Sequence, residues 1–177
     1  MDRLLGRPRV LRPTDAAEVA TGGRPEPRLL RTPRDAETAA RDWMIAWDHF
    51  DACLTREGAD AGIDVDSSDA VAQVKAQTQP TGRPDVQRLS GVASVEGKAG
   101  YFFSIAGFTD EAQEWAERAN IALFSFDLTG EPTPVNQVAE DALSRRVPDE
   151  RALEYARDLL DDYNDTVASM EDLKLRN

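Results

Sequence analysis

Residues 61–77 read AGIDVDSSDAVAQVKAQ, and this stretch decides the fold that we expect for the chain. Apolar residues flank Asp64, the polar run at 66–69 indicates a turn, and an alanine- and valine-rich run follows, which together predict a β-hairpin. Side chains alternate along a strand, so Gln73 and Lys75 share one face of the second strand and leave an apolar face to enter a core. The hairpin therefore brings one carboxylate close to one amide and one lysine.

This combination of side chains suits the metal-assisted hydrolysis of a phosphodiester. Asp64 offers oxygen ligands to a divalent ion, and Lys75 is suited to orient or activate the attacking water and to neutralise charge on the phosphate. A structural interpretation stays open beside this one. A polar pair on a strand is commonly the solvent-facing side of a sheet, and an aspartate at a strand end is commonly a turn residue.

Several segments, in the same order along the chain, resemble the Mrr-type restriction endonuclease domain, a branch of the PD-(D/E)XK nuclease superfamily. The resemblance extends over residues 35–128, a little over half of the chain. It is carried by DAETAARDWMIAW at 35–47, AGIDV at 61–65, QVK at 73–75, TGRPDVQRLSG at 81–91 and GYFFSIAGFTDEAQEWAERANIALFSFD at 100–127. The resemblance implies an α/β fold of the restriction-endonuclease type, with a central mixed β-sheet flanked by helices.

The same resemblance implies a Mg²⁺-dependent endodeoxyribonuclease, in which Mn²⁺ can substitute. Asp64 and Gln73 would ligate the ion with help from the Val74 carbonyl. Lys75 would act on the attacking water, which displaces the leaving group in line and with inversion. Glu37, in the place of the family's first-helix glutamate, would complete the site or position the water.

The sequence departs from the family pattern at three positions. Ala36 stands where an aromatic residue usually precedes the glutamate, and Ala61 stands where a glycine is often found. Gln73 is neutral where many members of the wider superfamily have an acidic residue, so metal binding would depend more strongly on the remaining ligands.

A candidate DNA contact follows the hairpin. The turn at 82–85 leads into a helix that carries Arg83, Gln87 and Arg88 near its start, where free backbone amides also favour an anion. These side chains are suited to contact a DNA phosphate or to hold a carboxylate of the site. Ordinary polarity of a helix surface is the alternative.

The other predicted elements alternate between helix and strand. A helix capped by Asp35 is expected to run through about Leu54, which would place His49 and Cys53 on it as packed or surface residues. A strand at 100–106, a helix at 110–118 that Thr109 caps, and a strand at 121–126 follow. This alternation predicts a sheet with helices on both sides.

Composition limits the classes of protein to consider. The chain has 177 residues, 41% of them hydrophobic, and one cysteine, which excludes an internal disulfide. No run of eighteen apolar residues is present, so a cytoplasmic protein with no membrane segment is expected. The net charge of −12 argues against a surface that embraces nucleic acid on all sides.

The charge is unevenly distributed, and this suggests three parts. Residues 1–34 hold eight arginines and four acids, a net charge of +4, which leaves −16 for the rest. They are expected to form an irregular, basic, proline-rich arm ahead of a nuclease domain at 35–130. A helical extension is expected at 131–177, where the long apolar stripe of 149–173 would pack on the domain or on a partner.

We therefore expect a metal-dependent DNA endonuclease in a restriction or phage-defence setting. Its partners would be DNA and a second copy of the chain, because cleavage of both strands requires two cuts. The alternative to a second copy is a partner subunit that supplies recognition, since nothing in the sequence resembles a helix-turn-helix or a base-flipping module. Two alternatives stay open: a catalytically silent nuclease-like subunit for DNA or protein binding, and a repair or junction-resolving nuclease on the same fold.

Overall fold

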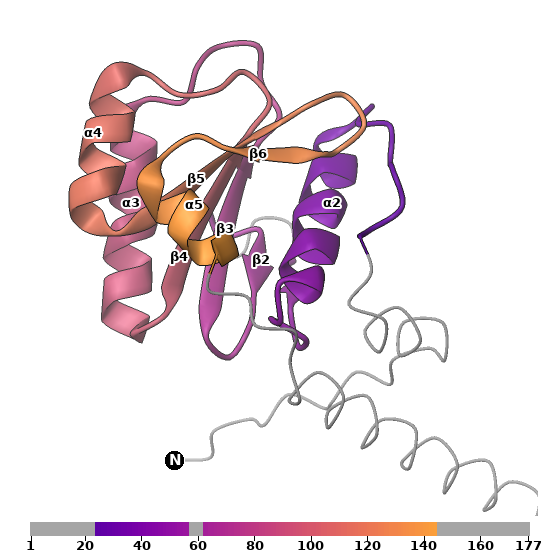
Figure 1. Cartoon of the computed structure of the whole chain (residues 1–177), viewed down its shortest axis with the longest axis horizontal. Coiled ribbons are helices and arrows are strands. Elements are labelled where there is room, and N and C mark those ends of the chain that lie inside the picture. The colour runs from indigo at the N-terminus through magenta and orange to yellow at the C-terminus, as the bar shows by residue number, and fades with distance from the viewer. Residues whose placement is uncertain (1–23, 57–61, 145–177) are drawn as a thin grey trace, which may run out of the picture. The chain divides into compact units, whose positions relative to one another are not determined.

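The computed structural model describes residues 24–56 and 62–144, and within them the chain forms a six-stranded sheet with helices on both faces (Figure 1). The sheet has the strand order β1-β2-β3-β4-β5-β6. Its strands are β1 (Cys53–Leu54), β2 (Val65–Asp66), β3 (Ala70–Lys75), β4 (Ala99–Ser104), β5 (Ile121–Phe126) and β6 (Pro132–Pro134). The helices are α2 (Pro33–Ala46), α3 (Arg83–Glu96), α4 (Asp110–Ala119) and α5 (Gln137–Ser144).

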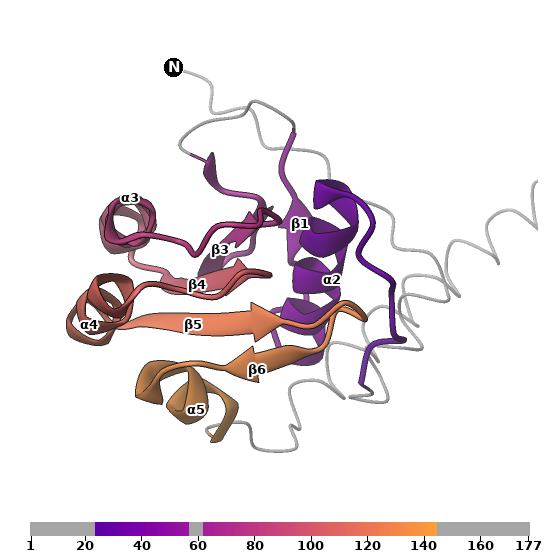
Figure 2. The same ribbon diagram turned by 90° about the horizontal axis from the view of Figure 1, so that it is seen from above.

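The sheet is mixed. β3, β4 and β5 pair in parallel through the crossover helices α3 and α4, whereas β1, β2 and β3 form an antiparallel meander and β6 returns antiparallel to β5. Figure 2 shows β3, β4, β5 and β6 side by side in this order. The parallel strands are covered on both faces, which explains why β4 and β5 are almost continuously apolar.

An apolar core lies on each face of the sheet. The core under α2 and α5 includes Met44, Phe103 and Phe124, and the core under α3 and α4 includes Leu89 and Phe102. Adjacent residues on β4 enter opposite cores because side chains alternate along a strand. The fold is therefore the α/β arrangement with a central mixed sheet that the sequence predicts.

The predicted hairpin is present as β2 and β3, with Val65 opposite Ala72 and a turn at 67–69. The segment after it also follows the prediction. Thr109 caps α4 by accepting a hydrogen bond from the Ala112 backbone, and β5 begins and ends where the apolar run does.

The first helix is shorter than predicted. It begins at Pro33, where Thr32 and Asp35 form a reciprocal capping box, and it ends at Ala46 rather than near Leu54. Asp48 takes the left-handed conformation with φ of 70°, and the chain then turns into β1. The cap residue is therefore Thr32, and Asp35 is its partner in the capping box. The apolar residues beyond Trp47 that continue the helical repeat are not in a helix.

Two residues that were assigned to that helix lie elsewhere. His49 is buried just after it, and Cys53 is exposed on the edge strand β1 rather than packed on a helix. The predicted C-terminal helix and the arm before residue 24 lie outside the described residues. None of the described helices is long and apolar enough to cross a membrane.

The described fold also includes residues on both sides of the nuclease-like stretch. Arg28 and Leu30 donate backbone hydrogen bonds to Thr129 and Leu128 in the turn after β5. The indole of Trp43 on α2 donates to the Gly130 carbonyl at 2.8 Å in the same turn. Residues that precede α2 are thereby held against the end of β5.

Candidate active site

Asp64 lies immediately before β2, where the hairpin holds its backbone and its side chain. Its backbone N–H donates to the Ala72 carbonyl at 2.9 Å, and its Oδ2 accepts a hydrogen bond from the Val74 N–H at 2.7 Å. These two residues stand on either side of Gln73, so the carboxylate is fixed beside that position. Asp64 is thus more than a turn residue, because its side chain takes the place of a ladder partner for β3.

Gln73 points into the molecule and is 3% exposed. Its Oε1 has no hydrogen-bond partner among the residues that the structure describes. Its amide also lies against Gly62, since a Cβ added to that glycine would come within 3.1 Å of Nε2. A buried acceptor without a donor is costly, so this oxygen is suited to a ligand that the protein alone does not provide.

The charges around Asp64 come from two elements, α2 and β3. Burial raises the pKa of the Asp64 carboxyl, whereas the hydrogen bond from Val74 lowers it; the negative charge of Glu37 raises it, and the positive charges of Lys75 and Arg34 lower it. Glu37 and Arg34 stand in the first two turns of α2, and Lys75 ends β3. The structure therefore brings the predicted residues Glu37, Asp64, Gln73 and Lys75 to one region.

Lys75 is paired with a carboxylate that the sequence did not single out. Its Nζ lies 3.8 Å from Oδ1 of Asp85 in the first turn of α3, and Nη1 of Arg88 lies 2.9 Å from the same oxygen. Asp85 therefore connects the predicted catalytic lysine with a predicted DNA-binding arginine. The 3.8 Å contact leaves the lysine only loosely held.

The other two predicted DNA contacts lie together on the side of α3 that faces α4. The guanidinium of Arg83 lies 4.5 Å from the centre of the Trp115 ring. With the amide of Gln87 turned so that its oxygen faces Arg83, it accepts hydrogen bonds from Nε and Nη2 at 3.2 Å each. Arg83 and Gln87 are thus held by each other and by Trp115, whereas Arg88 is held by Asp85.

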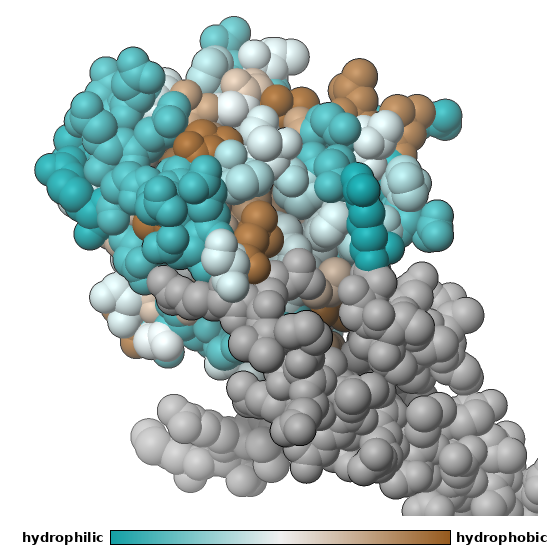
Figure 3. All heavy atoms as spheres, in the orientation of Figure 1, coloured by the Kyte–Doolittle hydropathy of each residue, from teal (hydrophilic) through white to brown (hydrophobic). Residues whose placement is uncertain are grey.

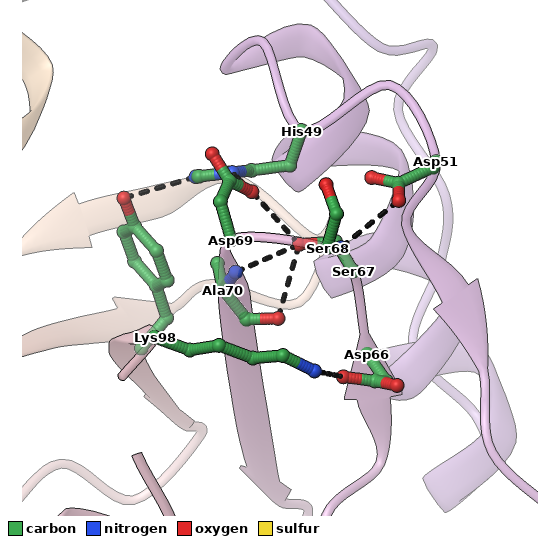
Figure 4. Close-up of polar contacts among 9 residues, drawn as sticks. His49, Asp51, Asp66, Ser67, Ser68, Asp69, Ala70 and Lys98 are labelled. Atoms are coloured by element: carbon green, nitrogen blue, oxygen red, sulfur yellow. Dashed lines mark hydrogen bonds and ion pairs between the residues drawn. The ribbon is translucent and has the colours of Figure 1, made fainter. Parts of the chain in front are cut away.

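The far end of the hairpin is tied to the rest of the domain (Figure 4). Nδ1 of His49 lies 2.7 Å from Asp69, and its Nε2 lies 3.0 Å from the Tyr101 hydroxyl. Asp51 accepts a hydrogen bond from the Ser68 N–H at 2.9 Å, on the side of the turn that faces β1. These contacts fix the turn, so the single histidine has the packed role that the sequence favoured.

The sequence analysis gave no role to Arg34, which lies just before the segments that resemble the family, or to Asp85, which lies inside TGRPDVQRLSG at 81–91. A signal was present for both, since each has an oppositely charged residue three positions later on a helix. That spacing occurs on many helix surfaces and does not show which pairs lie beside a site.

The oxygen atoms around Asp64 are of the kind that a small divalent cation prefers. Among the described residues, no group of three or more histidine, cysteine, aspartate or glutamate side chains is close enough to hold a metal ion. The candidate ligands are instead one half-buried carboxylate, the unpartnered Gln73 Oε1 and a backbone carbonyl, with Glu37 nearby. Mg²⁺ prefers oxygen and keeps several of its waters, so a site with few protein ligands suits it.

The outer surface of α4 is unsuited to DNA. Its exposed residues include Asp110, Glu111, Glu114 and Glu117, and the same side of the molecule is largely hydrophilic in Figure 3. Four acids on one helix repel a phosphate backbone. DNA is therefore expected to approach from the side of Lys75 and the start of α3.

One of three comparisons with known proteins found a match. The model of a restriction endonuclease family, Mrr_cat, matches residues 32–128, which include α2, the hairpin, α3, β4, α4 and β5. No curated protein and no solved structure matched the chain in the other two comparisons. Because the matched stretch is more than half of the chain and holds every residue of the candidate site, the chain belongs to the Mrr_cat family of restriction endonucleases.

Proposed function

We propose that the chain is a Mg²⁺-dependent DNA endonuclease that acts in the cytoplasm in restriction or phage defence. Membership in the restriction endonuclease family supports a nuclease of this general kind. The metal dependence, the assignment of residues and the biological setting are our proposal.

In this proposal each residue of the site has a distinct task. Asp64, Gln73 and the Val74 carbonyl hold the ion, and Glu37 completes its surroundings or positions a water. When bound, Mg²⁺ neutralises the charge on the cleaved phosphate and makes a coordinated water more acidic. Lys75 orients the attacking water and stabilises negative charge on the phosphate, while Arg88, with Arg83 and Gln87, contacts the DNA backbone.

One observation carries the proposal. The Asp64 carboxylate is fixed by the Val74 N–H beside Gln73, whose buried Oε1 has no partner among the described residues. A purely structural hairpin would gain from an apolar side chain at residue 73, since an unsatisfied buried amide costs about 1–3 kcal/mol. A divalent cation would satisfy both oxygens.

The proposal is tested by cleavage of methylated and unmethylated plasmid DNA with Mg²⁺ or Mn²⁺. We expect nicking or linearisation by the wild type that EDTA abolishes and that Asp64→Asn and Lys75→Ala reduce by at least about a hundredfold. Glu114→Gln, on the exposed face of α4, is the control and should cleave as the wild type does. Cleavage that persists in both site variants would contradict the assignment.

A non-catalytic subunit is the second candidate, and the neutral Gln73 favours it because an amide binds Mg²⁺ more weakly than a carboxylate. The same variants separate the two functions. A silent subunit would bind DNA or a partner protein equally well with and without Asp64, and no metal would produce cleavage.

A further inference from the structure

Arg34 makes contacts that reach two different elements. It stands in the first turn of α2, and its Nη1 lies 2.8 Å from Glu37 Oε2. The same nitrogen donates to the Thr55 carbonyl, just after β1, at 3.4 Å. One guanidinium nitrogen therefore connects the helix that carries Glu37 with the end of the edge strand.

The contact continues from Thr55 to the metal-binding segment. The Thr55 N–H donates to the Asp64 carbonyl at 3.0 Å, and its hydroxyl donates to the Ile63 carbonyl at 2.6 Å. A continuous series of polar contacts therefore runs from Glu37 through Arg34 and Thr55 to the backbone of Asp64. It joins the Glu37 carboxylate to the backbone that carries Asp64 by a route separate from the β2–β3 ladder.

An ordinary surface ion pair is the alternative explanation. Exposed pairs three residues apart on a helix are common and contribute little. Arg34 differs because its second acceptor, Thr55, lies about twenty residues further along the chain and itself donates to the Asp64 backbone. The strands β1 and β2 are only two residues long, so the ladder between them supplies few hydrogen bonds to hold the segment that carries Asp64.

We propose that Arg34 is a positioning residue of the site, which holds Glu37 and the segment before β2 at the separation that the divalent ion requires. This role rests on the proposed function. Arg34 need not touch the ion or the DNA, since it acts through the orientation of Glu37 and the placement of Asp64. Groups that orient the ligands of a metal commonly change its affinity by about 10- to 100-fold when they are removed.

The test is a double-mutant cycle read by Mn²⁺ affinity of the full chain, measured by electron paramagnetic resonance of the free ion. Loss of a positive charge near the site would by itself strengthen Mn²⁺ binding. A weakening of about tenfold by Arg34→Gln in the wild-type background, with hardly any in the Glu37→Gln background, is therefore the result expected of a positioning residue. Arg28→Gln is the matched control, because Arg28 also pairs with an acid of α2 and is 45% exposed beside 47% for Arg34. Thermal unfolding of each variant confirms that the fold is kept.

Each outcome separates this inference from the function on which it rests. If the wild type binds Mn²⁺, Asp64→Asn does not, and Arg34→Gln binds as the wild type does, the role of Arg34 is wrong and the metal site stands. Equal losses from Arg34→Gln in both backgrounds would show a general effect on folding rather than positioning through Glu37, and would also overturn it. No binding by the wild type would remove the metal site itself, together with any positioning role at it.

Discussion

At the scale of single residues, the site consists of groups that are unfavourable in the absence of a ligand. Burial is the main cause of the raised pKa of Asp64, and the nearby charge of Glu37 adds to it. Gln73 buries an acceptor without a described partner. Shifted pKa values and unmet polar groups of this kind are typical of functional sites, where binding compensates for them.

Asp64→Asn should stabilise the metal-free protein at neutral pH. A raised folded pKa means that the folded state binds protons more tightly, so the stability of the wild type falls as pH rises from the unfolded value of 3.8 through the folded pKa. The variant keeps an oxygen for the Val74 N–H but lacks this titration. Urea unfolding in EDTA should show the gain at pH 7 and none well below pH 3.8, whereas a variant that is less stable at pH 7 would contradict the account.

Gln73→Leu should separate stability from metal binding. Replacing the amide breaks no described hydrogen bond of Oε1. The free energy of unfolding in EDTA should therefore stay the same or rise by up to about 1 kcal/mol. The rise in melting temperature that Mn²⁺ produces in the wild type should be lost, because that rise measures binding to the folded state. Scanning calorimetry with and without Mn²⁺ gives both values. An undiminished Mn²⁺ effect would exclude Gln73 as a ligand.

At the scale of elements, local signals explain which parts the sequence predicts. α4 has a threonine cap at Thr109 and ends at Asn120 in the left-handed conformation, so its bounds are decided within its own residues. α2 is different. Its apolar repeat continues past Trp47, but the chain leaves the helix to let His49 and Asp51 reach a turn about twenty residues further on. No local pattern reveals a contact of that range.

The site shows the same division. The residues on the hairpin could be predicted because alternation along a strand places Gln73 and Lys75 on one face. Arg34 and Asp85 lie near the candidate site because α2 and α3 pack beside the hairpin. That packing cannot be predicted from local sequence patterns. Glu37 also lies on α2, and its separation from Asp64 along the chain does not reveal that the two are close. It was predicted only through the resemblance to the family.

Gly62→Ala should disturb the hairpin more than a comparable change elsewhere. Gly62 has φ of +75°, and an added Cβ would meet Gln73 Nε2 at 3.1 Å. Gly97, with φ of +67° and nothing within 4 Å of the added Cβ, is the matched control for backbone strain alone. We expect a cost of about 1 kcal/mol at Gly97 and a larger cost at Gly62, measured by urea unfolding. Equal costs would mean that Gln73 moves away freely.

At the scale of the whole molecule, the sheet brings together residues from both halves of the described chain. The antiparallel β1–β2–β3 meander carries Asp64 and Lys75, and the crossover through α3 presents Arg88 to the same end of β3. The net charge of −12 and the acidic face of α4 oppose binding of DNA elsewhere.

DNA binding should therefore depend on a divalent ion. We expect a labelled duplex to bind at least about tenfold more tightly in Ca²⁺ than in EDTA, because a cation at Asp64 and Gln73 offsets the repulsion between an acidic protein and phosphate. Fluorescence anisotropy at constant ionic strength measures this difference. Gln73→Leu should lose most of the increase while Glu114→Gln keeps it. Equal affinity in EDTA and in Ca²⁺ would place the DNA contact away from the site.

The most direct test of the central claim is the position of a bound ion. Crystals grown or soaked with Mn²⁺ would show it by anomalous diffraction. The account predicts a peak about 2 Å from an Asp64 carboxylate oxygen and from Gln73 Oε1, close to the Val74 carbonyl. A peak at other carboxylates, or none at Mn²⁺ concentrations that support cleavage, would contradict it.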